Sequence, residues 1–146
     1  MSTFDHAALT QNINKALKSF RQSQAPVMQG FAQLSQAALA DGAIDAKTKE
    51  LIALAIGVTQ KCSGCIGFHV QALHKLGATR AELDEMLGLC VYMGGGPALM
   101  YCALAYRQGT TAWMTLLTAL IVMLGAANGW VPLGQNHPLA GTHAWD

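Results

Sequence analysis

Two cysteines and a histidine stand close together in residues 60–70, which read QKCSGCIGFHV. Cys65 follows Cys62 by three positions, and His69 follows Cys65 by four. On one helix these spacings place all three side chains on the same face. A thiolate is a nucleophile, a second thiol nearby can turn its sulfenic acid into a disulfide, and an imidazole can carry the proton. The pattern therefore favours thiol redox chemistry.

The helix that carries these residues is expected to begin at or near Cys62. Unpaired backbone N–H groups and the helix macrodipole favour an anion at that end. Such a position lowers the pKa of a thiol from about 8.5 towards roughly 3.5 to 7.5. Lys61, beside Cys62, could add positive charge, although a lysine next to a helix start is common. Ser63 and Gly64 are small and leave the thiols accessible.

Other uses of the same residues stay open to different degrees. Attachment of a c-type haem needs a histidine directly after the second cysteine, where this chain has Ile66. A structural zinc site needs four ligands, and His74 lies one turn too far along to help. A pair of ordinary buried cysteines also remains open. The alternative from another class is a non-enzymatic metal-binding or interaction module whose cysteines are ligands.

Composition limits the class of protein. The chain has 146 residues, enough for one domain, and it is 52% apolar but only 12% charged. Such a chain is expected to bury part of its surface against other subunits, a membrane, or both. The net charge of +1 and the lack of a basic patch argue against nucleic-acid binding.

The first residues indicate a cytoplasmic protein. They contain Asp5 and lack the apolar core of a secretory signal. In a reducing compartment a close cysteine pair is more often catalytic or metal-binding than a structural crosslink.

The pattern of apolar residues predicts an all-α fold of about six to seven helices. The first predicted helix covers about residues 5–20, the second runs from Pro26 to an end at Gly42, and the third runs from an N-cap at Asp45 to about residue 60. The fourth runs from Cys62 to Gly77, and the fifth begins with a capping box at residues 79–82. After a break at residues 94–97, the sixth runs from Pro97 to about Gln108.

The last part of the chain has a different composition. Residues 108–145 contain no Lys, Arg, Asp or Glu, and residues 110–127 are almost continuously apolar. We therefore predict a helical domain over residues 1–108, followed by an apolar helix and an irregular tail over residues 109–146. Residues 110–127 are marginal in length for a membrane span, so membrane contact through them is possible but burial against protein is preferred.

The remaining cysteines are interpreted as structural. Cys90 and Cys102 lie in apolar surroundings, where buried thiols behave as small hydrophobic groups. No cofactor and no metal ion is expected.

About residues 41–106 resemble a known family. The segment KELIALAIGVTQKCSGCIGFHVQALHKLGATRAELDEMLGLCVYMGGGPALMYC is similar to the core of the alkylhydroperoxidase D-like branch of the carboxymuconolactone decarboxylase family. That branch has a Glu, eleven residues, then Cys-x-x-Cys-x-x-x-His, and Glu50, Cys62, Cys65 and His69 fit this register. The best-studied peroxidases of the family have a His where this chain has Gly64.

The resemblance implies a fold, an assembly and an activity. These are a compact helical bundle of the alkylhydroperoxidase D-like type, a homotrimer or homohexamer, and thiol-dependent reduction of peroxides with an antioxidant role. It implies that Cys65 is the cysteine linked to His69 and Glu50 and that Cys62 closes the disulfide. The partners would be a small-molecule peroxide and an external dithiol electron-donor protein. The alternative within the family is decarboxylation of a lactone of aromatic catabolism, which does not need a cysteine pair.

Overall fold

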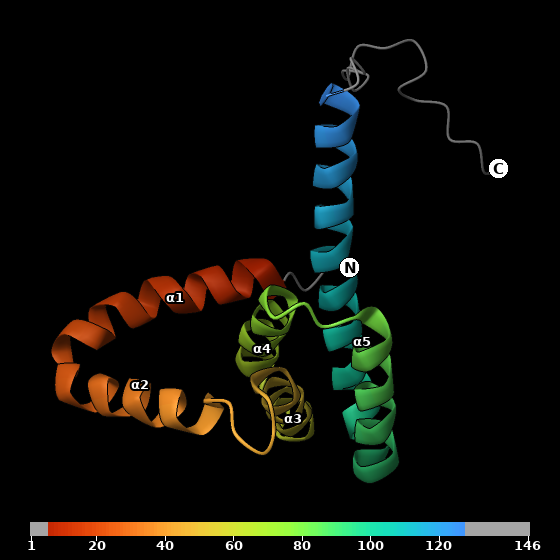
Figure 1. Ribbon diagram of the computed structural model, residues 1–146. Helices are drawn as coiled ribbons and strands as arrows, with labels where there is room; N and C mark the ends of the chain where they lie inside the picture. The colour runs from red at the N-terminus through yellow and green to blue at the C-terminus, as the bar shows by residue number, and fades with distance from the viewer. Residues whose placement is uncertain (1–5, 128–146) are drawn as a thin grey trace. The chain divides into compact units, whose positions relative to one another are not determined.

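The computed structural model of the protein describes residues 6–127, and every regular element in that range is an α-helix (Figure 1). The all-α prediction is confirmed. The helices are α1 His6–Ser23, α2 Ala25–Leu39, α3 Ala46–Thr59, α4 Ser63–Lys75 and α5 Arg80–Ala127. Because α5 is interrupted at Gly95, the described residues contain six helical stretches, the lower end of the predicted range.

Two predicted helix starts are confirmed by their hydrogen bonds. The Asp45 side chain accepts from the backbone N–H of Thr48 at 2.8 Å and caps α3. Before α5, the N–H of Thr79 donates to Glu82 Oε2 at 2.6 Å, and the N–H of Glu82 donates to Thr79 Oγ1 at 3.2 Å. This reciprocal pair is the predicted capping box, and it fixes where the first turn of α5 begins.

The predicted end of the second helix at Gly42 is wrong. α2 ends at Leu39, because Ala40 takes an extended backbone with ψ of 143°. The Asp41 carboxylate then accepts from the backbone N–H of Ala46 at 2.8 Å. Gly42 therefore lies inside the loop that leads to α3, not at the end of α2. The first helix also runs to Ser23, beyond the predicted end near Phe20.

The predicted break at residues 94–97 is confirmed and turns α5 back on itself. Gly95 has φ of 62° and ψ of −155°, a conformation that is essentially restricted to glycine. The two halves then meet at their far ends. The Arg80 guanidinium lies 3.6 Å from the centre of the Tyr106 ring, and its Nη1 donates to Thr110 Oγ1 at 2.6 Å. Residues 80–110 thus form a helical hairpin.

One hydrophobic core joins α3, α4 and both halves of this hairpin. Its largest fully buried side chains come from all three elements: Leu54, Val58, Ile66, Val70, Leu73 and Leu83. α4 is the central element, because it packs against α3 on one side and α1 on another. The helix that bears the predicted site is therefore held between two neighbours.

The chain separates into two compact units, residues 1–113 and residues 114–146. The first unit contains α1 to α4 and the α5 hairpin. In the second unit α5 continues as helix to Ala127, which places a helix over the apolar run predicted at residues 110–127. The irregular tail predicted after residue 127 lies outside the described residues.

Among the described residues, the stretch Arg80–Thr110 is long and apolar enough to cross a membrane by length and composition. The break at Gly95 interrupts it, and both of its halves supply core residues, including Leu83, Leu87 and Cys102. A core helix of a soluble protein passes the same test, so this stretch is weak evidence for a membrane segment.

Candidate active site: a cysteine pair beside a part-buried histidine–glutamate pair

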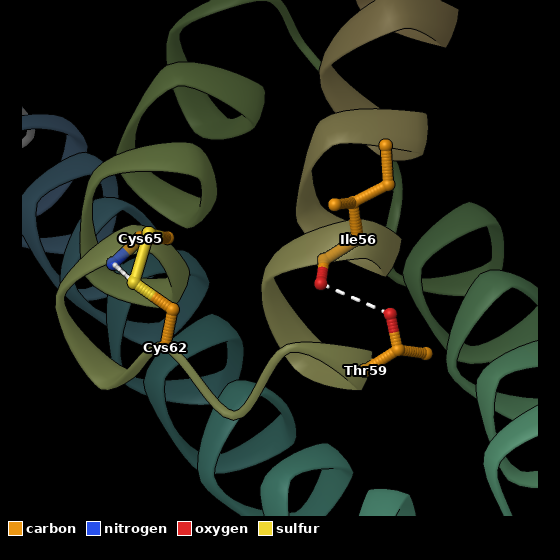
Figure 2. Close-up of a disulfide and its surroundings, with 4 residues drawn as sticks. All are labelled: Ile56, Thr59, Cys62 and Cys65. Carbon is orange, nitrogen blue, oxygen red and sulfur yellow. Dashed lines mark hydrogen bonds between the residues drawn. A yellow bond between two sulfur atoms is a disulfide. The ribbon is translucent and has the colours of Figure 1, made fainter.

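Cys62 and Cys65 are joined by a disulfide at the first turn of α4 (Figure 2). Cys62 is the N-cap residue, and its Sγ accepts from the backbone N–H of Cys65 at 3.3 Å. One sulfur atom therefore lies where the helix presents unpaired N–H groups, as expected from the sequence. This environment stabilises a thiolate on Cys62 when the pair is reduced.

A tight turn after α3 places the pair. The backbone N–H of Cys62 donates to Gly57 O at 2.9 Å, and that of Lys61 donates to Val58 O at 3.1 Å. These two bonds form a Schellman motif, whose turning residue is Lys61 with φ of 57°. The turn normally favours glycine, so Lys61 occupies it at a conformational cost.

The last turns of α3 lie directly against the disulfide. A Cβ added to Gly57 would stand 3.2 Å from Cys65 Cβ, which is closer than nine in ten real contacts of this kind. The hydroxyl of Thr59 donates to Ile56 O at 3.0 Å and completes this end of α3 (Figure 2). Gly57 therefore permits the close approach of α3 and α4 at the cysteine pair.

His69 and Glu50 form a short hydrogen bond between α4 and α3. His69 Nδ1 lies 2.6 Å from Glu50 Oε2, and the side chains are 29% and 9% exposed. A carboxylate can only accept, so Nδ1 carries the hydrogen and Nε2 is left as the basic nitrogen. A buried carboxylate that holds an imidazole in one tautomer is the arrangement used to position a general acid or base.

α1 covers the other side of the first turns of α4. A Cβ on Gly64 would stand 3.0 Å from Ile13 Cδ1, and a Cβ on Gly67 would overlap the hydroxyl of Thr10. Thr10 is accordingly buried. A side chain at position 64 would have to displace the end of the Ile13 side chain by a few tenths of an ångström, whereas glycine fits without adjustment.

The four predicted site residues therefore form two pairs, and the two members of each pair contact each other. Cys62 and Cys65 are bonded to each other, and His69 and Glu50 are hydrogen-bonded across two helices. His69 follows Cys65 by one turn of α4, which links the pairs on one helix face. The sequence analysis did not identify Gly57, although a glycine inside a helical pattern is a signal of close packing.

Cys90 and Cys102 are buried free thiols, as predicted. Burial, and after it the neighbouring Cys102 thiol, raises the pKa of the Cys90 thiol to about 11. Burial also raises the pKa of Cys102. Within the described part of the chain, no group of three or more His, Cys, Asp or Glu side chains is placed to hold a metal ion.

Comparison with known proteins agrees with this fold and this motif. The model of the carboxymuconolactone decarboxylase family matches residues 25–108, more than half of the chain. The chain belongs to the carboxymuconolactone decarboxylase family. The alkylhydroperoxidase D-like branch inferred from the cysteine and histidine spacing is consistent with this membership.

Similar proteins are known from several bacteria. A crystal structure of a carboxymuconolactone decarboxylase family protein from Legionella pneumophila, in its apo form, is 52% identical, covers 73% of this chain and 96% of its own, and has a TM-score of 0.72. An uncharacterised protein of Cupriavidus necator is 40% identical over 114 residues, which are 77% of this chain and all of that protein. A protein of the cox locus of Paracoccus denitrificans, also uncharacterised, is 35% identical over 57% of this chain and 75% of its own length.

Proposed function

We propose that this family member is a thiol-dependent peroxidase and disulfide oxidoreductase with an antioxidant role. The observation that carries the proposal is the cysteine pair at the N-terminus of α4, on the same helix as a histidine hydrogen-bonded to a buried glutamate. Decarboxylation of a lactone would not require two cysteines at this spacing. The peroxidase reaction uses all four residues.

The first step is attack of the Cys65 thiolate on the peroxide. A bond forms from sulfur to the distal oxygen, the O–O bond breaks, and Cys65 becomes a sulfenic acid. His69 takes the proton of the Cys65 thiol at Nε2 and returns it to the departing alkoxide, which leaves as an alcohol. Glu50 holds the imidazole in place, because the carboxylate lies 2.6 Å from Nδ1.

The second step closes the disulfide. The Cys62 thiol attacks the sulfenic sulfur of Cys65, and water leaves with the thiol proton. The product is the Cys62–Cys65 bond, the oxidised state of the site. A dithiol donor protein then reduces it by thiol–disulfide exchange, so the turnover needs no bound cofactor or metal.

The proposal includes a cytoplasmic homotrimer or homohexamer. In support, α2 buries none of its residues, and its apolar side chains Val27, Phe31 and Leu34 are each more than 60% exposed. Exposed apolar surface of this kind is typical of subunit interfaces. Sedimentation equilibrium of the reduced protein should give three or six chains, and a monomer would contradict this part.

A steady-state assay distinguishes the two reactions of the family. With dithiothreitol as the dithiol and an alkyl hydroperoxide as the substrate, the protein should consume hydroperoxide catalytically and form the alcohol. The Cys65→Ser variant should be inactive. Release of carbon dioxide from a carboxymuconolactone at a rate that Cys65→Ser leaves unchanged, with no hydroperoxide turnover, would favour the decarboxylase instead.

A further inference from the structure

A second group of sulfur atoms lies in the core, away from the disulfide. Cys90 Sγ stands 3.5 Å from Met86 Sδ, one turn earlier on the first half of α5. Cys102, on the second half, donates to Leu87 O at 3.5 Å and so reaches the same turn. Both thiols are buried and belong to the same hydrophobic core. We name Met86, Cys90 and Cys102 the core sulfur cluster.

The spacing within this cluster suits a single small ion. Two sulfur ligands of one metal, each about 2.3 Å from it, lie roughly 3.5 to 4.6 Å apart. The Cys90 and Met86 sulfurs are already at 3.5 Å, at the lower end of that range. Because Cys102 comes from the other half of the hairpin, an ion bound here would connect both halves across the break at Gly95.

The chemistry of the three donors selects the metal. Thiolate and thioether sulfurs are soft ligands and favour Cu(I) over hard cations. Zinc would need a fourth ligand, and the core residues around the cluster are apolar. We propose that the core sulfur cluster binds one Cu(I), with the Cys90 thiolate and the Met86 thioether as ligands and the Cys102 thiol as the third donor.

The charges and hydrogen bonds of this site balance. Cys90 loses its proton to water when Cu(I) binds, so one thiolate neutralises one monovalent cation and no net charge enters the core. The hydrogen bonds given up are weak, because the Cys90 thiol contacts Met86 Sδ at 3.5 Å and Ala55 O at 3.9 Å. Little of the folding free energy is lost when the ion replaces these contacts.

A pocket gives the ion a route to the cluster. It has a volume of about 370 Å³ and lies between the two halves of the α5 hairpin, with Leu87, Val91, Leu99, Cys102 and Tyr106 among its lining residues. Leu99 and Tyr106 are about half exposed, whereas Cys102 is buried. The pocket therefore reaches from the surface to one donor of the cluster.

The test uses the full-length Cys62→Ser/Cys65→Ser protein, in which the disulfide pair cannot compete for metal. Under anaerobic conditions Cu(I), added as its acetonitrile complex, is titrated against the chelator bicinchoninate. The protein should remove one Cu(I) per chain from the chelator. X-ray absorption of the complex should show sulfur neighbours at about 2.2 to 2.3 Å.

Two further variants locate the site. Adding Met86→Leu, which conserves volume and keeps the helix, should weaken Cu(I) binding at least tenfold, and adding Cys90→Ser should abolish it. Met93→Leu, the same change at an exposed methionine of α5, should leave the affinity unchanged, and circular dichroism checks that every variant is folded. The proposal is overturned if the starting protein takes no Cu(I) from the chelator, or if folded Met86→Leu binds as tightly as the Met93→Leu control.

Discussion

At the scale of single residues, the candidate site depends on the different surroundings of two similar thiols. Cys62 is the N-cap of α4, while Cys65 lies inside the helix, one turn before His69. The N-terminal position favours a thiolate on Cys62, whereas peroxide reduction needs a proton donor near the nucleophile. The proposed mechanism assigns the attack on the peroxide to Cys65, because His69 follows Cys65 by one helical turn and is hydrogen-bonded to Glu50.

The assignment of the two cysteines predicts different results for the two serine variants. With hydroperoxide, Cys62→Ser should accumulate a sulfenic acid on Cys65 that a dimedone probe traps, because no resolving thiol remains. Cys65→Ser should abolish turnover and leave no trapped sulfenic acid on Cys62. Mass spectrometry of the labelled peptides identifies which cysteine carries the dimedone adduct in each variant. A dimedone adduct on Cys62 in the Cys65→Ser protein would reverse the roles.

The His69–Glu50 hydrogen bond predicts graded losses of rate. His69→Gln removes the proton carrier and should slow hydroperoxide reduction by roughly 10²-fold, the usual contribution of one general acid or base. Glu50→Gln should have a smaller effect, because its amide oxygen can still accept from Nδ1 but carries no charge. The measurement is kcat/KM against pH. Because the proton carrier is lost, His69→Gln should also change the shape of this profile, and an unchanged rate and profile would exclude the proton-carrier role.

At the scale of the helices, α4 is fixed in place by close approaches that glycine allows. Gly57 lets α3 approach Cys65, and Gly64 lets Ile13 of α1 pack beside the cysteine pair. The start of α5 is fixed differently, by the Thr79 and Glu82 capping box. Glu82 also binds Lys47 of α3, with Nζ and Oε1 2.6 Å apart. This ion pair connects α3 and α5, the helices before and after α4 in the sequence.

The Lys47–Glu82 pair predicts an acid dependence of stability. The hydrogen bond from Lys47, followed by those from Thr79, lowers the pKa of Glu82 from 4.5 to about 2. A carboxylate whose pKa is lowered by folding stabilises the fold above its unfolded pKa and loses that effect as the pH falls towards its folded pKa. The stability advantage of the wild type over Glu82→Gln should therefore be full above about pH 4.5 and vanish towards pH 2.

Urea unfolding of both proteins between pH 2 and pH 7 measures this difference. Glu85→Gln, the same substitution at an exposed residue of α5, is the matched control and should follow the wild type at every pH. If the free energy of unfolding of Glu82→Gln changes with pH in parallel with that of the wild type, the ion pair does not make the stability depend on pH.

Local signals explain which elements could be predicted from the sequence. Asp45, the Thr79–Glu82 box and Gly95 act through bonds or dihedral angles within a few residues, so their helix starts and break were predicted correctly. Directly after α2, the Asp41 carboxylate accepts a hydrogen bond from the backbone N–H of Ala46, five positions later. The residue pattern of α2 does not predict this bond.

The residues of the candidate site also differ in whether local sequence patterns predict their positions. The proximity of Cys62, Cys65 and His69 follows from helical spacing along one segment. Glu50 stands on a different helix, so its position could be inferred only from the family resemblance. The contact of Ile13 with Gly64 joins elements about fifty residues apart, and no local pattern encodes it.

At the scale of the whole chain, a helical unit of residues 1–113 contains the complete candidate site, and α5 continues beyond it to Ala127. The family match ends at Gln108, before this continuation. Residues 108–145 carry no Lys, Arg, Asp or Glu, and we propose that a partner surface shields their apolar stretch from water. Our preferred partner is protein, not lipid.

This preference predicts where the chain is found in cells. On fractionation without detergent, the full-length protein should remain in the supernatant, because residues 110–127 are marginal in length for a bilayer and have no basic anchor at their far end. A chain ending at Gln108 is the comparison. If the full-length protein pellets with membranes while the shortened chain stays soluble and active, residues 110–127 are an anchor.

The central claim is that the cysteine pair of α4 reduces peroxides, and a single-turnover experiment tests it most directly. The protein is reduced, the reductant is removed, and one equivalent of an alkyl hydroperoxide per chain is added before acid quenching and peptide mass mapping. The account predicts one alcohol formed per chain, a peptide lighter by two hydrogens that joins Cys62 to Cys65, and free thiols at Cys90 and Cys102. Unreacted hydroperoxide beside a reduced Cys62 and Cys65, or oxidation confined to Cys90 and Cys102, would contradict it.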